Sequence, residues 1–542
     1  MFLETGSLSQ LTDSSRGAAP EADPISLAVI QASLAAAADE MFTMLRRTAM
    51  SPIIYEVLDV GTGVTDGAGN LADSGAGIPT FVGVLDKAVR RIVELASDTG
   101  IVEGDLFATN DPNFGGVTHL NDVVIAMPVF HAGERIAWAA SIGHWSDIGG
   151  MTPGSMSTGA VELHQEGLRL PAVKLFDAGR KLDSIFDIIA ANSRVPEIAL
   201  GDLWAQISAS RRAGERIRRL AGNFGADAFN RALAEMFDEG EVRARRGLTK
   251  LPAGTYGIEE EQDDGAVWKA HIRVSEEVFE VDLRDNPRQR ASPYNTSRDG
   301  AVIAAQMIFK ALTDSGRFAN AGSFRPLQVL TRPGSVFHAE GSAPHGYYFE
   351  TRIRLYDMLW RCMAKAFPDR LPAGSFGSIC ATVLVGKHAD TGRTFAMVEP
   401  QMGGWGATAQ RDGVDCMYSA SHGETFNCPV EICEARYGLE VGWRKLGDPG
   451  GPGLHRGGRG MSTSYRTGGP AVLAAGYSCH RKRVWGLNGG SAGGHNRLTV
   501  IRQGKVRERH AFVSDLRLQA GEEILIETAG GGGWGSPRLP SA

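Results

Sequence analysis

A pair of apolar, β-branched runs joined by a short polar segment constrains this chain more than any other feature. The runs cover residues 123–130 and 136–143, and the segment HAGER between them places Gly133 at a turn position. Such a pair predicts an antiparallel β-hairpin. Because side chains alternate along a strand, a slip of one residue would move a whole strand's side chains to the other face. The position of the turn therefore decides which polar residues meet at the open end.

The open end of this hairpin carries two polar clusters, with the sequences HLND and HWSD. A hairpin centred on Gly133 places Asp122 opposite His144. The same register places His119 opposite Asp147. Directly opposed residues hold their Cβ atoms about 4.5–5.5 Å apart. In a straight strand His119 and Asp122 would face opposite ways, so one of them must lie in a turn before the strand begins.

Two imidazoles and two carboxylates that converge in this way have the chemistry of a metal site. Such a set suits zinc, manganese or iron, and three protein ligands would leave a position open for water or substrate. Thr118 or Asn121 would support the turn before the strand. The spacing alone leaves a second interpretation open, in which the four residues only cap the hairpin by hydrogen bonding, because short His/Asp motifs recur by chance.

Composition limits the classes of partner and compartment. The chain has 542 residues with 43% hydrophobic and 22% charged residues, which is typical of a soluble globular protein of three or four units. Its net charge of −6 argues against a nucleic-acid or anionic-membrane partner. We expect no membrane-spanning helix, since no apolar run approaches about 20 residues. The polar, acidic N-terminus is not a secretory signal, and six cysteines without a CxxC pair indicate reduced thiols, so we expect a cytoplasmic protein.

Periodicity predicts an α+β fold in a large, mixed, multi-unit chain. Residues 25–50, 79–100 and 180–247 have helical periodicity, although residues 78–84 also look like a short strand, and alternation begins near residue 251. Many of the 69 glycines lie in the last third, where strands separated by tight turns are expected. The first half is therefore predicted to be helical and the last third β-rich. The predicted units, which we expect to be interwoven, are a flexible tail over 1–24, a metal-site and helical domain over 25–250, a mixed α/β domain over 251–395 and a β-rich domain over 396–542.

Several motifs in order along the chain resemble those of the hydantoinase B/oxoprolinase family. They include NDPNFGGVTHLNDVVIAMPVF, GHWSDIGGMTPGSMS, MGGWGATAQRDGVD, NCPVEICEARYGLEV and ETAGGGGWGSP, and the resemblance runs from about residue 26 to 538. It implies a B-type subunit like those of ATP-dependent hydantoinases and lactamases and of acetone and acetophenone carboxylases. It also implies an A-type partner with an actin- or sugar-kinase-like ATP fold, in a hetero-oligomer such as (AB)2. No GxxxxGK[ST] loop occurs in the chain, which fits ATP being bound by the partner, with no nucleotide site here.

The resemblance also assigns roles within the polar clusters. It implies that His119, Asp122 and His144 hold a divalent metal, zinc or manganese or else iron, and that Asp59 is a further ligand. A turn-forming role is the alternative for Asp59. Asp147 is then expected to hold a His ring N–H and fix its tautomer, because such partners orient metal-binding imidazoles.

Other residues are expected to support this site. Asn121 is assigned a supporting or catalytic role, and five residues are predicted to shape the pocket or the turn ahead of it: Asn110, Asp111, Gly116, Gly403 and Trp405. A packed turn is the alternative for the Gly-Gly-Trp motif. Many family members carry histidines in a segment like HIPVHLG, whereas this chain reads GIPTFVG, with Gly77 and Phe81. We expect this altered segment to face the site, which leaves the substrate class open.

The expected activity is hydrolysis of a ring amide, such as a hydantoin or lactam, after the partner has activated it with ATP. Carboxylation of a ketone, with bicarbonate as a co-substrate, is the first alternative. The length of the chain favours the hydrolase, since the carboxylase subunits of this type are longer. A non-catalytic scaffold for an ATPase partner is the second alternative.

Overall fold

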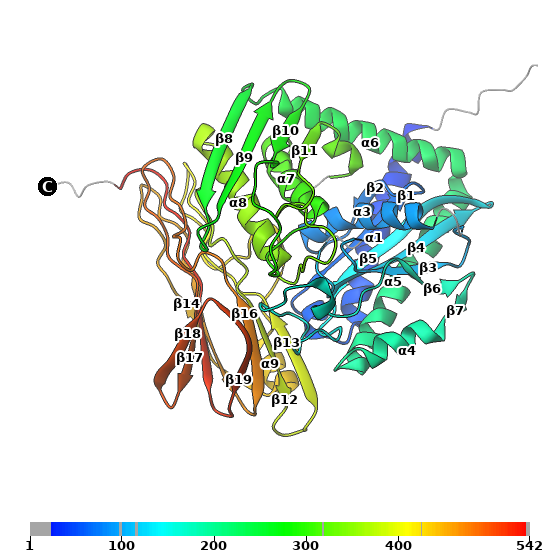
Figure 1. The fold of residues 1–542 in the computed structure, drawn as a ribbon. Coiled ribbons are helices and arrows are strands. Elements are labelled where there is room, and N and C mark those ends of the chain that lie inside the picture. Colours follow the sequence, from blue (N-terminus) through cyan, green and yellow to red (C-terminus); the bar gives the residue numbers. More distant parts are fainter. Residues whose placement is uncertain (1–22, 97–99, 114–117, 317–318, 424, 538–542) are drawn as a thin grey trace, which may run out of the picture.

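The structure is a computed structural model, and its described residues form four β-sheets with helices packed against them (Figure 1). The helices gather in the first half of the chain and the last third is mostly strands, so the predicted α+β class is confirmed. Most of the tail predicted over residues 1–24 lies outside the described residues. The described ranges are 23–96, 100–113, 118–316, 319–423 and 425–537.

The N-terminal part is built on a seven-stranded sheet with the order β2-β1-β5-β4-β3-β6-β7. The central pair β4–β5 is the hairpin predicted from the sequence. The strands are β1 (Val60–Asp66), β2 (Leu71–Ser74), β3 (Leu106–Thr109), β4 (Asp122–His131), β5 (Glu134–His144), β6 (Val173–Asp177) and β7 (Arg180–Lys181).

Six helices and a 3-10 turn accompany this sheet in the described residues. The Asp23 carboxylate caps the first helix by accepting the N–H groups of Ile25 and Ser26. The helices predicted over 25–50, from Pro79 onward and over 180–247 are confirmed, but the short strand also expected over 78–84 is wrong, because the helix that begins at Pro79 covers these residues. The elements are α1 (Pro24–Thr48), α2 (Pro52–Tyr55), α3 (Pro79–Leu95), the turn η1 (Leu163–Gln165), α4 (Asp183–Ala191), α5 (Pro196–Phe224) and α6 (Ala226–Leu248).

Helix α1 belongs to a core that extends across the chain. Among the described residues it is the one helix whose length and apolar composition would also suit a membrane span. Its side chains Ile30, Leu34 and Met41 are fully buried, and the helix packs against α5 and α6. The same buried cluster includes Tyr465 and Ile526 of the last third. This core therefore crosses the unit boundaries that the sequence suggested.

The middle of the chain forms a four-stranded sheet with the order β11-β10-β9-β8, next to two helices. Figure 1 shows helix α8 between this sheet and the C-terminal strands. The elements are β8 (Gly254–Glu261), β9 (Val267–Val274), β10 (Phe279–Asp282), α7 (Arg298–Thr313), the 3-10 turn η2 (Ala321–Phe324), β11 (Leu327–Leu330) and α8 (Tyr348–Ala366).

The last third forms two antiparallel sheets, with the orders β13-β12-β16-β19 and β14-β15-β20-β17-β18. The glycine-rich loops between them pack backbone against backbone: a Cβ atom on Gly404 would collide with the backbone of Gly458 and Gly531. The elements are β12 (Ala381–Lys387), β13 (Thr394–Glu399), α9 (Val430–Tyr437), β14 (Leu439–Leu446), β15 (Met461–Thr467), β16 (Ala471–Gly476), β17 (Arg497–Arg502), β18 (Lys505–His510), β19 (Phe512–Leu518) and β20 (Glu523–Glu527).

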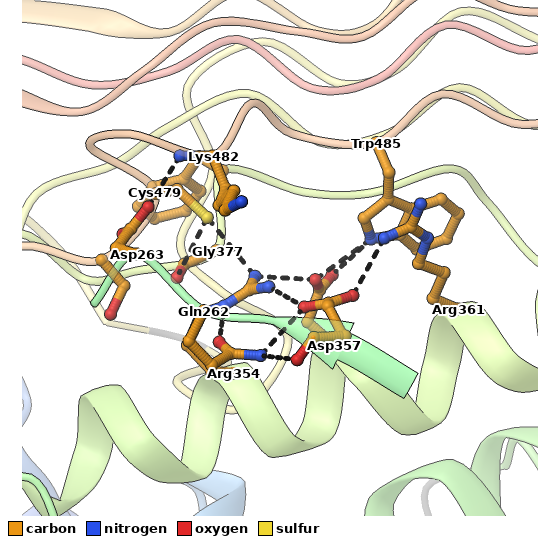
Figure 2. Close-up of polar contacts among 12 residues, drawn as sticks. Gln262, Asp263, Arg354, Asp357, Arg361, Gly377, Cys479, Lys482 and Trp485 are labelled. Atoms are coloured by element: carbon orange, nitrogen blue, oxygen red, sulfur yellow. Dashed lines mark hydrogen bonds and ion pairs between the residues drawn. The ribbon is translucent and has the colours of Figure 1, made fainter. Parts of the chain in front are cut away.

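Helix α8 is fixed by a buried polar network on one side (Figure 2). The Arg354 guanidinium donates to Asp357, with Nη1 2.8 Å from Oδ2, and it also pairs with Glu260 of β8. The indole Nε1 of Trp485 donates to Asp357 over 3.0 Å, and Arg361 pairs with Glu260 over 3.0 Å. These contacts tie α8 to the β8–β9 hairpin and to a C-terminal loop, and thereby fix where its first turn lies.

Candidate metal centre

The β4–β5 hairpin brings two of the predicted ligands face to face. Asp122, the first residue of β4, pairs directly with His144, the last residue of β5. Ala132 and Gly133, both with positive φ, form the turn. The two residue pairs next to the turn are one residue out of the predicted register. A register shift between Val129 and Phe130 then brings the rest of the two strands into the predicted pairing. His119 lies just before β4 in a turn, because its carbonyl accepts the N–H of Asp122 over 3.1 Å. The predicted register is therefore confirmed for the pair at the open end.

His119, Asp122 and His144 form a compact buried group. One ligand-type atom from each lies within 4.8 Å of the others, and all three residues are at most 3% exposed. The Nε2 atom of His119 is 3.2 Å from Oδ1 of Asp122, and the two imidazole rings have their centroids 5.0 Å apart. The three side chains thus converge on one point from a turn and two strands.

The hydrogen bonding of this group fits a divalent cation. Within the described part of the chain, both ring nitrogens of His144 are buried without a hydrogen-bond partner, and the neighbour of Oδ1 of Asp122 is Nε2 of His119, 3.2 Å away. Buried polar atoms are rarely left unpaired, because this costs free energy. The Nδ1 atom of His119 lies 3.0 Å from the carbonyl oxygen of Gly346 and donates to it, which leaves a lone pair on Nε2. Two imidazole lone pairs and one carboxylate oxygen are thus available together, as a three-ligand site for zinc or a similar ion requires.

The protonation states of these groups also suit ligation. Burial, and then the neighbouring His119 ring, lower the pKa of His144 to about 3, so its imidazole is neutral near pH 7. Burial opposes ionisation of Asp122, but the adjacent His119 outweighs it and lowers the pKa of this carboxyl. In His119 the Asp122 carboxylate outweighs burial and raises the pKa of the imidazole. A cation would replace the proton that this pair shares, since metal ligands must be deprotonated.

Asp59 lies beside this group but outside its compact part. It directly precedes β1, and its carbonyl accepts the N–H of His144 over 3.1 Å. Its side chain lines the same cavity, and burial and then the Asp122 carboxylate raise its pKa well above the usual value. The three-residue group defined by the 4.8 Å separations does not include it. Its role as a fourth ligand stays a prediction.

A small cavity of about 30 Å³ adjoins the three side chains. This is enough space for a water molecule but not for a whole ring substrate. Ile78, Thr80 and Phe81 contribute to its wall, so the segment GIPTFVG faces the site as expected. Gly77 enters this segment with a φ of 130°, and a Cβ atom there would collide with the carbonyl of Val60. Of the two positions where the resemblance leads one to expect histidine, Phe81 lines the cavity.

Three polar residues of the wall were not predicted from the sequence. Tyr348 donates its hydroxyl to Oδ2 of Asp122 over 3.1 Å. Arg352, one turn further along α8, and His422 also line the cavity. Burial lowers the pKa of His422 to about 3, so this imidazole is neutral near pH 7. No signal in the local sequence marks these residues, because they lie more than 200 positions from Asp122.

The role predicted for Asp147 is wrong in the structure. Its carboxylate accepts the backbone N–H groups of Gly149 and Gly154 and pairs with Arg194, with Nη1 2.9 Å from Oδ2. The partner that holds the ring N–H of His119 is instead the carbonyl of Gly346. Asp147 therefore stabilises the loop after β5 and does not orient a ligand.

Asn121, Asn110 and Asp111 support the turn that carries His119. The amide of Asn121 donates to the carbonyls of Trp145 and Gly154, and Asn110 donates to the carbonyl of Leu120 over 2.7 Å. The buried carboxylate of Asp111 pairs with Arg169. None of the three is among the side chains that line the cavity. Gly116, predicted with them, lies outside the described residues.

Gly403 and Trp405 lie away from the metal centre. Gly403 packs under the Phe376 ring, which a Cβ atom would overlap. Trp405 donates its indole N–H to the carbonyl of Tyr418 and lines a different cavity, of about 260 Å³. The pocket role predicted for these two residues is therefore wrong for the metal cavity, and the packed-turn alternative describes Gly403.

Comparison with known sequences places this architecture in a family. The sequence profile described as Hydantoinase B/oxoprolinase matches residues 23–537, which is nearly the whole chain. The chain belongs to the hydantoinase B/oxoprolinase family. A relative from Pseudomonas sp. (strain NS671), named as the putative B-type subunit of a D-/L-hydantoinase, is 30% identical, over 95% of this chain and 90% of its own length.

Solved structures extend the comparison from sequence to fold. The ATP-dependent caprolactamase from Pseudomonas jessenii superimposes with a TM-score of 0.87 at 25% identity, covering 95% of this chain and 92% of that one. A nucleotide-free acetone carboxylase gives the same TM-score at 18% identity, covering 95% of this chain and 76% of that one. The second likeness shows a shared fold. These relatives place the chain in the context of an enzyme family, and the hydantoinase relative is named as a subunit.

Proposed function

We propose that this chain is the metal-containing B-type subunit of an ATP-dependent cyclic amidase of the hydantoinase, N-methylhydantoinase or lactamase type. The observation that carries the proposal is the buried convergence of His119, Asp122 and His144, with ligand atoms that lack other partners. The similarity to a putative hydantoinase and to a caprolactamase supports the choice of cyclic amides as substrates.

The proposed division of labour assigns ATP to a partner. The chain carries no GxxxxGK[ST] phosphate loop. An A-type subunit of the hydantoinase A or oxoprolinase kind would bind ATP and phosphorylate the amide oxygen, which makes the carbonyl carbon electrophilic. The activated ring would then reach the metal centre of this chain in a cytoplasmic hetero-oligomer such as (AB)2. Subunit names among the relatives support this arrangement.

In this proposal His119, Asp122 and His144, with Asp59 as a candidate fourth ligand, hold zinc or manganese, or else iron. The bound cation would lower the pKa of water and so supply a nucleophile at neutral pH. Tyr348 holds Oδ2 of Asp122 and leaves Oδ1 for ligation. The carbonyl of Gly346 fixes the tautomer of His119. In the net reaction two waters are consumed with one ATP. One adds its hydroxyl group to the ring carbonyl carbon, the ring C–N bond breaks and the nitrogen takes the remaining proton. The other releases the phosphoryl group as inorganic phosphate, and ADP is the nucleotide product.

Carboxylation of a ketone is a second candidate, because the chain shares its fold with an acetone carboxylase. Bicarbonate would then be a co-substrate at the same centre. The two candidates differ in the fate of labelled bicarbonate. If the label enters a stable acid product, the amidase proposal fails and the carboxylase takes its place. A scaffold that only positions an ATPase partner would require no metal, so its test is the metal content.

The experiment that tests the proposal uses the chain purified together with its A-type partner. Metal content and ATP turnover are measured against a panel of hydantoins, lactams and ketones, for the wild type and for His119→Ala. A matched control is His131→Ala, which changes a histidine at the far end of strand β4. We expect His119→Ala alone to lose both metal and ring opening. Full ring opening by metal-free His119→Ala protein would refute the proposal.

A further inference from the structure

Arg352 is a buried cation without a matching anion. The residue is 1% exposed, and the carboxylates near it in the described part of the chain, those of Asp122, Asp59 and Glu350, act on its guanidinium through their charge without a hydrogen bond to it. Its Nη1 donates to the hydroxyl of Thr80, and its Nε is buried without a partner. An arginine side chain offers five N–H donors and cannot act as an acceptor. A buried charge in this state is costly, so its presence calls for a ligand.

The charges that face Arg352 do not neutralise it. The nearest favourable ones come from Tyr348, Asp122, Asp59 and Glu350, yet burial outweighs them and lowers the pKa of Arg352. The carboxylate of Glu350 already accepts the Ser378 hydroxyl and backbone N–H groups. Asp122 is a proposed metal ligand, and a bound cation would also attract the carboxylate of Asp59. When a cation occupies the metal centre, less negative charge therefore remains to balance the positive charge of Arg352.

Arg354, two residues further along α8, shows the usual solution for a buried arginine. It pairs with Glu260 and Asp357 (Figure 2), and its surroundings raise its pKa well above the usual value. The two arginines lie on one helix and are both buried. Only Arg352 faces the metal cavity. The unmatched charge is thus specific to the site and is not a general property of this helix.

The cavity gives the ligand its size and chemistry. Its volume of about 30 Å³ has room for an oxygen-sized group between Arg352 and the side chains of the metal centre. Tyr348 and Phe349, in the first turn of α8, also line it, and the N-terminal end of a helix favours negative charge. The planar guanidinium fork matches the oxygens of phosphate and carboxylate-like groups. A cation, a planar donor array and a helix N-terminus together select an oxyanion.

We propose that Arg352, positioned by Thr80, is an oxyanion-binding residue that holds a negatively charged oxygen of the substrate beside the metal centre. The ligand class is a small oxyanion, as present in a phosphoryl group or in bicarbonate. This inference rests on the proposed function for its place in the reaction, because a phosphorylated ring amide and bicarbonate both bring such an oxygen to the centre. The binding of the oxyanion is nevertheless measurable without turnover.

The test is equilibrium dialysis with radiolabelled inorganic phosphate and, separately, radiolabelled bicarbonate. The protein is the full chain with its A-type partner and without ATP, with and without added zinc or manganese. The variants are Arg352→Met, which keeps the apolar stem, and Arg352→Lys, which keeps the charge but loses the planar fork. Arg243→Met, an exposed arginine on α6, is the matched control. Metal content is measured on the same samples.

We expect Arg352→Met to weaken oxyanion binding by about tenfold to a hundredfold, in line with a lost hydrogen-bonded charge. Arg352→Lys should bind more weakly than the wild type, and Arg243→Met should bind equally well. Preference for phosphate would identify an activated amide as the source of the oxyanion, and preference for bicarbonate would identify a carboxylation. The inference is overturned if the wild type binds neither ion, or if Arg352→Met binds as well as the wild type. If Arg352→Met does not fold, wild-type affinity in Arg352→Lys overturns it.

The same samples separate this inference from the proposed function. Arginine offers no ligand atom to a cation, so all three variants should keep their metal. Metal present without Arg352-dependent oxyanion binding would overturn only the oxyanion site. Absence of metal from the wild type would overturn the proposed metal centre, whatever the dialysis shows.

Discussion

Asp122 and His144 lie directly opposite each other at the open end of the β4–β5 hairpin, in a cross-strand pair. Both are buried. The ring nitrogens of His144 have no hydrogen-bond partner in the described residues, and Oδ1 of Asp122 faces Nε2 of His119 over 3.2 Å. A cross-strand pair holds two side chains on the same face at a nearly fixed separation. The backbone register, together with the turn that carries His119, therefore positions the metal centre before any cation binds.

Tyr348→Phe should weaken metal binding without removing it. The change deletes the hydroxyl that donates to Oδ2 of Asp122 and frees this carboxylate to rotate. Loss of such a supporting hydrogen bond typically lowers metal affinity about 10- to 100-fold. Competition with a chelator measures the affinity. Tyr356→Phe, on the same helix but away from the centre, is the control, and equal affinities of the two variants would contradict the assigned role.

The two buried arginines of α8 should respond oppositely to truncation. Arg352→Met removes an unmatched charge, so the free energy of unfolding of the metal-free protein should stay the same or rise. Arg354→Met removes one cationic partner from each of the buried carboxylates of Glu260 and Asp357, which keep Arg361 and Trp485 respectively, and should lower it by about 3–5 kcal/mol. Urea denaturation measures both. A large loss of stability in Arg352→Met would show that the structure already supplies its counter-charge.

Asp202 is a buried carboxyl that joins α5 to the segment after α1. Its Oδ1 accepts the N–H groups of Met50 and Ser51, whereas Oδ2 has no partner within the described residues. Burial raises its pKa to about 6 from the usual 3.8. The unfolded chain therefore loses this proton at a lower pH than the folded chain does. Stability linked to Asp202 is fully present below about pH 4 and is lost as the pH rises to about 6.

Asp202→Asn should remove this pH dependence and stabilise the protein near pH 7.5. The amide keeps an oxygen to accept both N–H groups and carries no charge to bury. A shift of about two pKa units corresponds to a gain of up to about 3 kcal/mol at neutral pH. Denaturation at about pH 4 and at about pH 7.5 measures the difference between wild type and variant. A gain of the same size at both pH values would contradict ionisation as its cause.

The local part of the metal centre could be predicted from the sequence. The hairpin runs and the glycine of the turn fix the register, and the register alone placed Asp122 opposite His144. The helices could be predicted for a similar reason, because their periodicity is contained in one segment. The strand expected over 78–84 failed, since its apolar residues form one face of α3 once Pro79 begins the helix.

The distant part of the cavity could not be predicted in this way. Tyr348, Arg352 and Thr80 reach the hairpin only through packing between segments far apart in the sequence, and no short motif encodes such packing. The role of Asp147 failed for a related reason. The carboxylate of Asp147 pairs with Arg194 and is therefore not available to a histidine ring. The tautomer of His119 is fixed by a backbone carbonyl, which any residue type would provide.

The metal content of the purified chain tests the central claim most directly. Elemental analysis of the wild type, Asp122→Ala, His119→Ala and the control His131→Ala gives the number of ions bound per chain. The account predicts close to one zinc, manganese or iron ion per chain in the wild type and in His131→Ala. It predicts almost none in Asp122→Ala or His119→Ala, because neither leaves three ligands from the compact group. A wild-type chain without metal, or equal metal content in all four proteins, would contradict it.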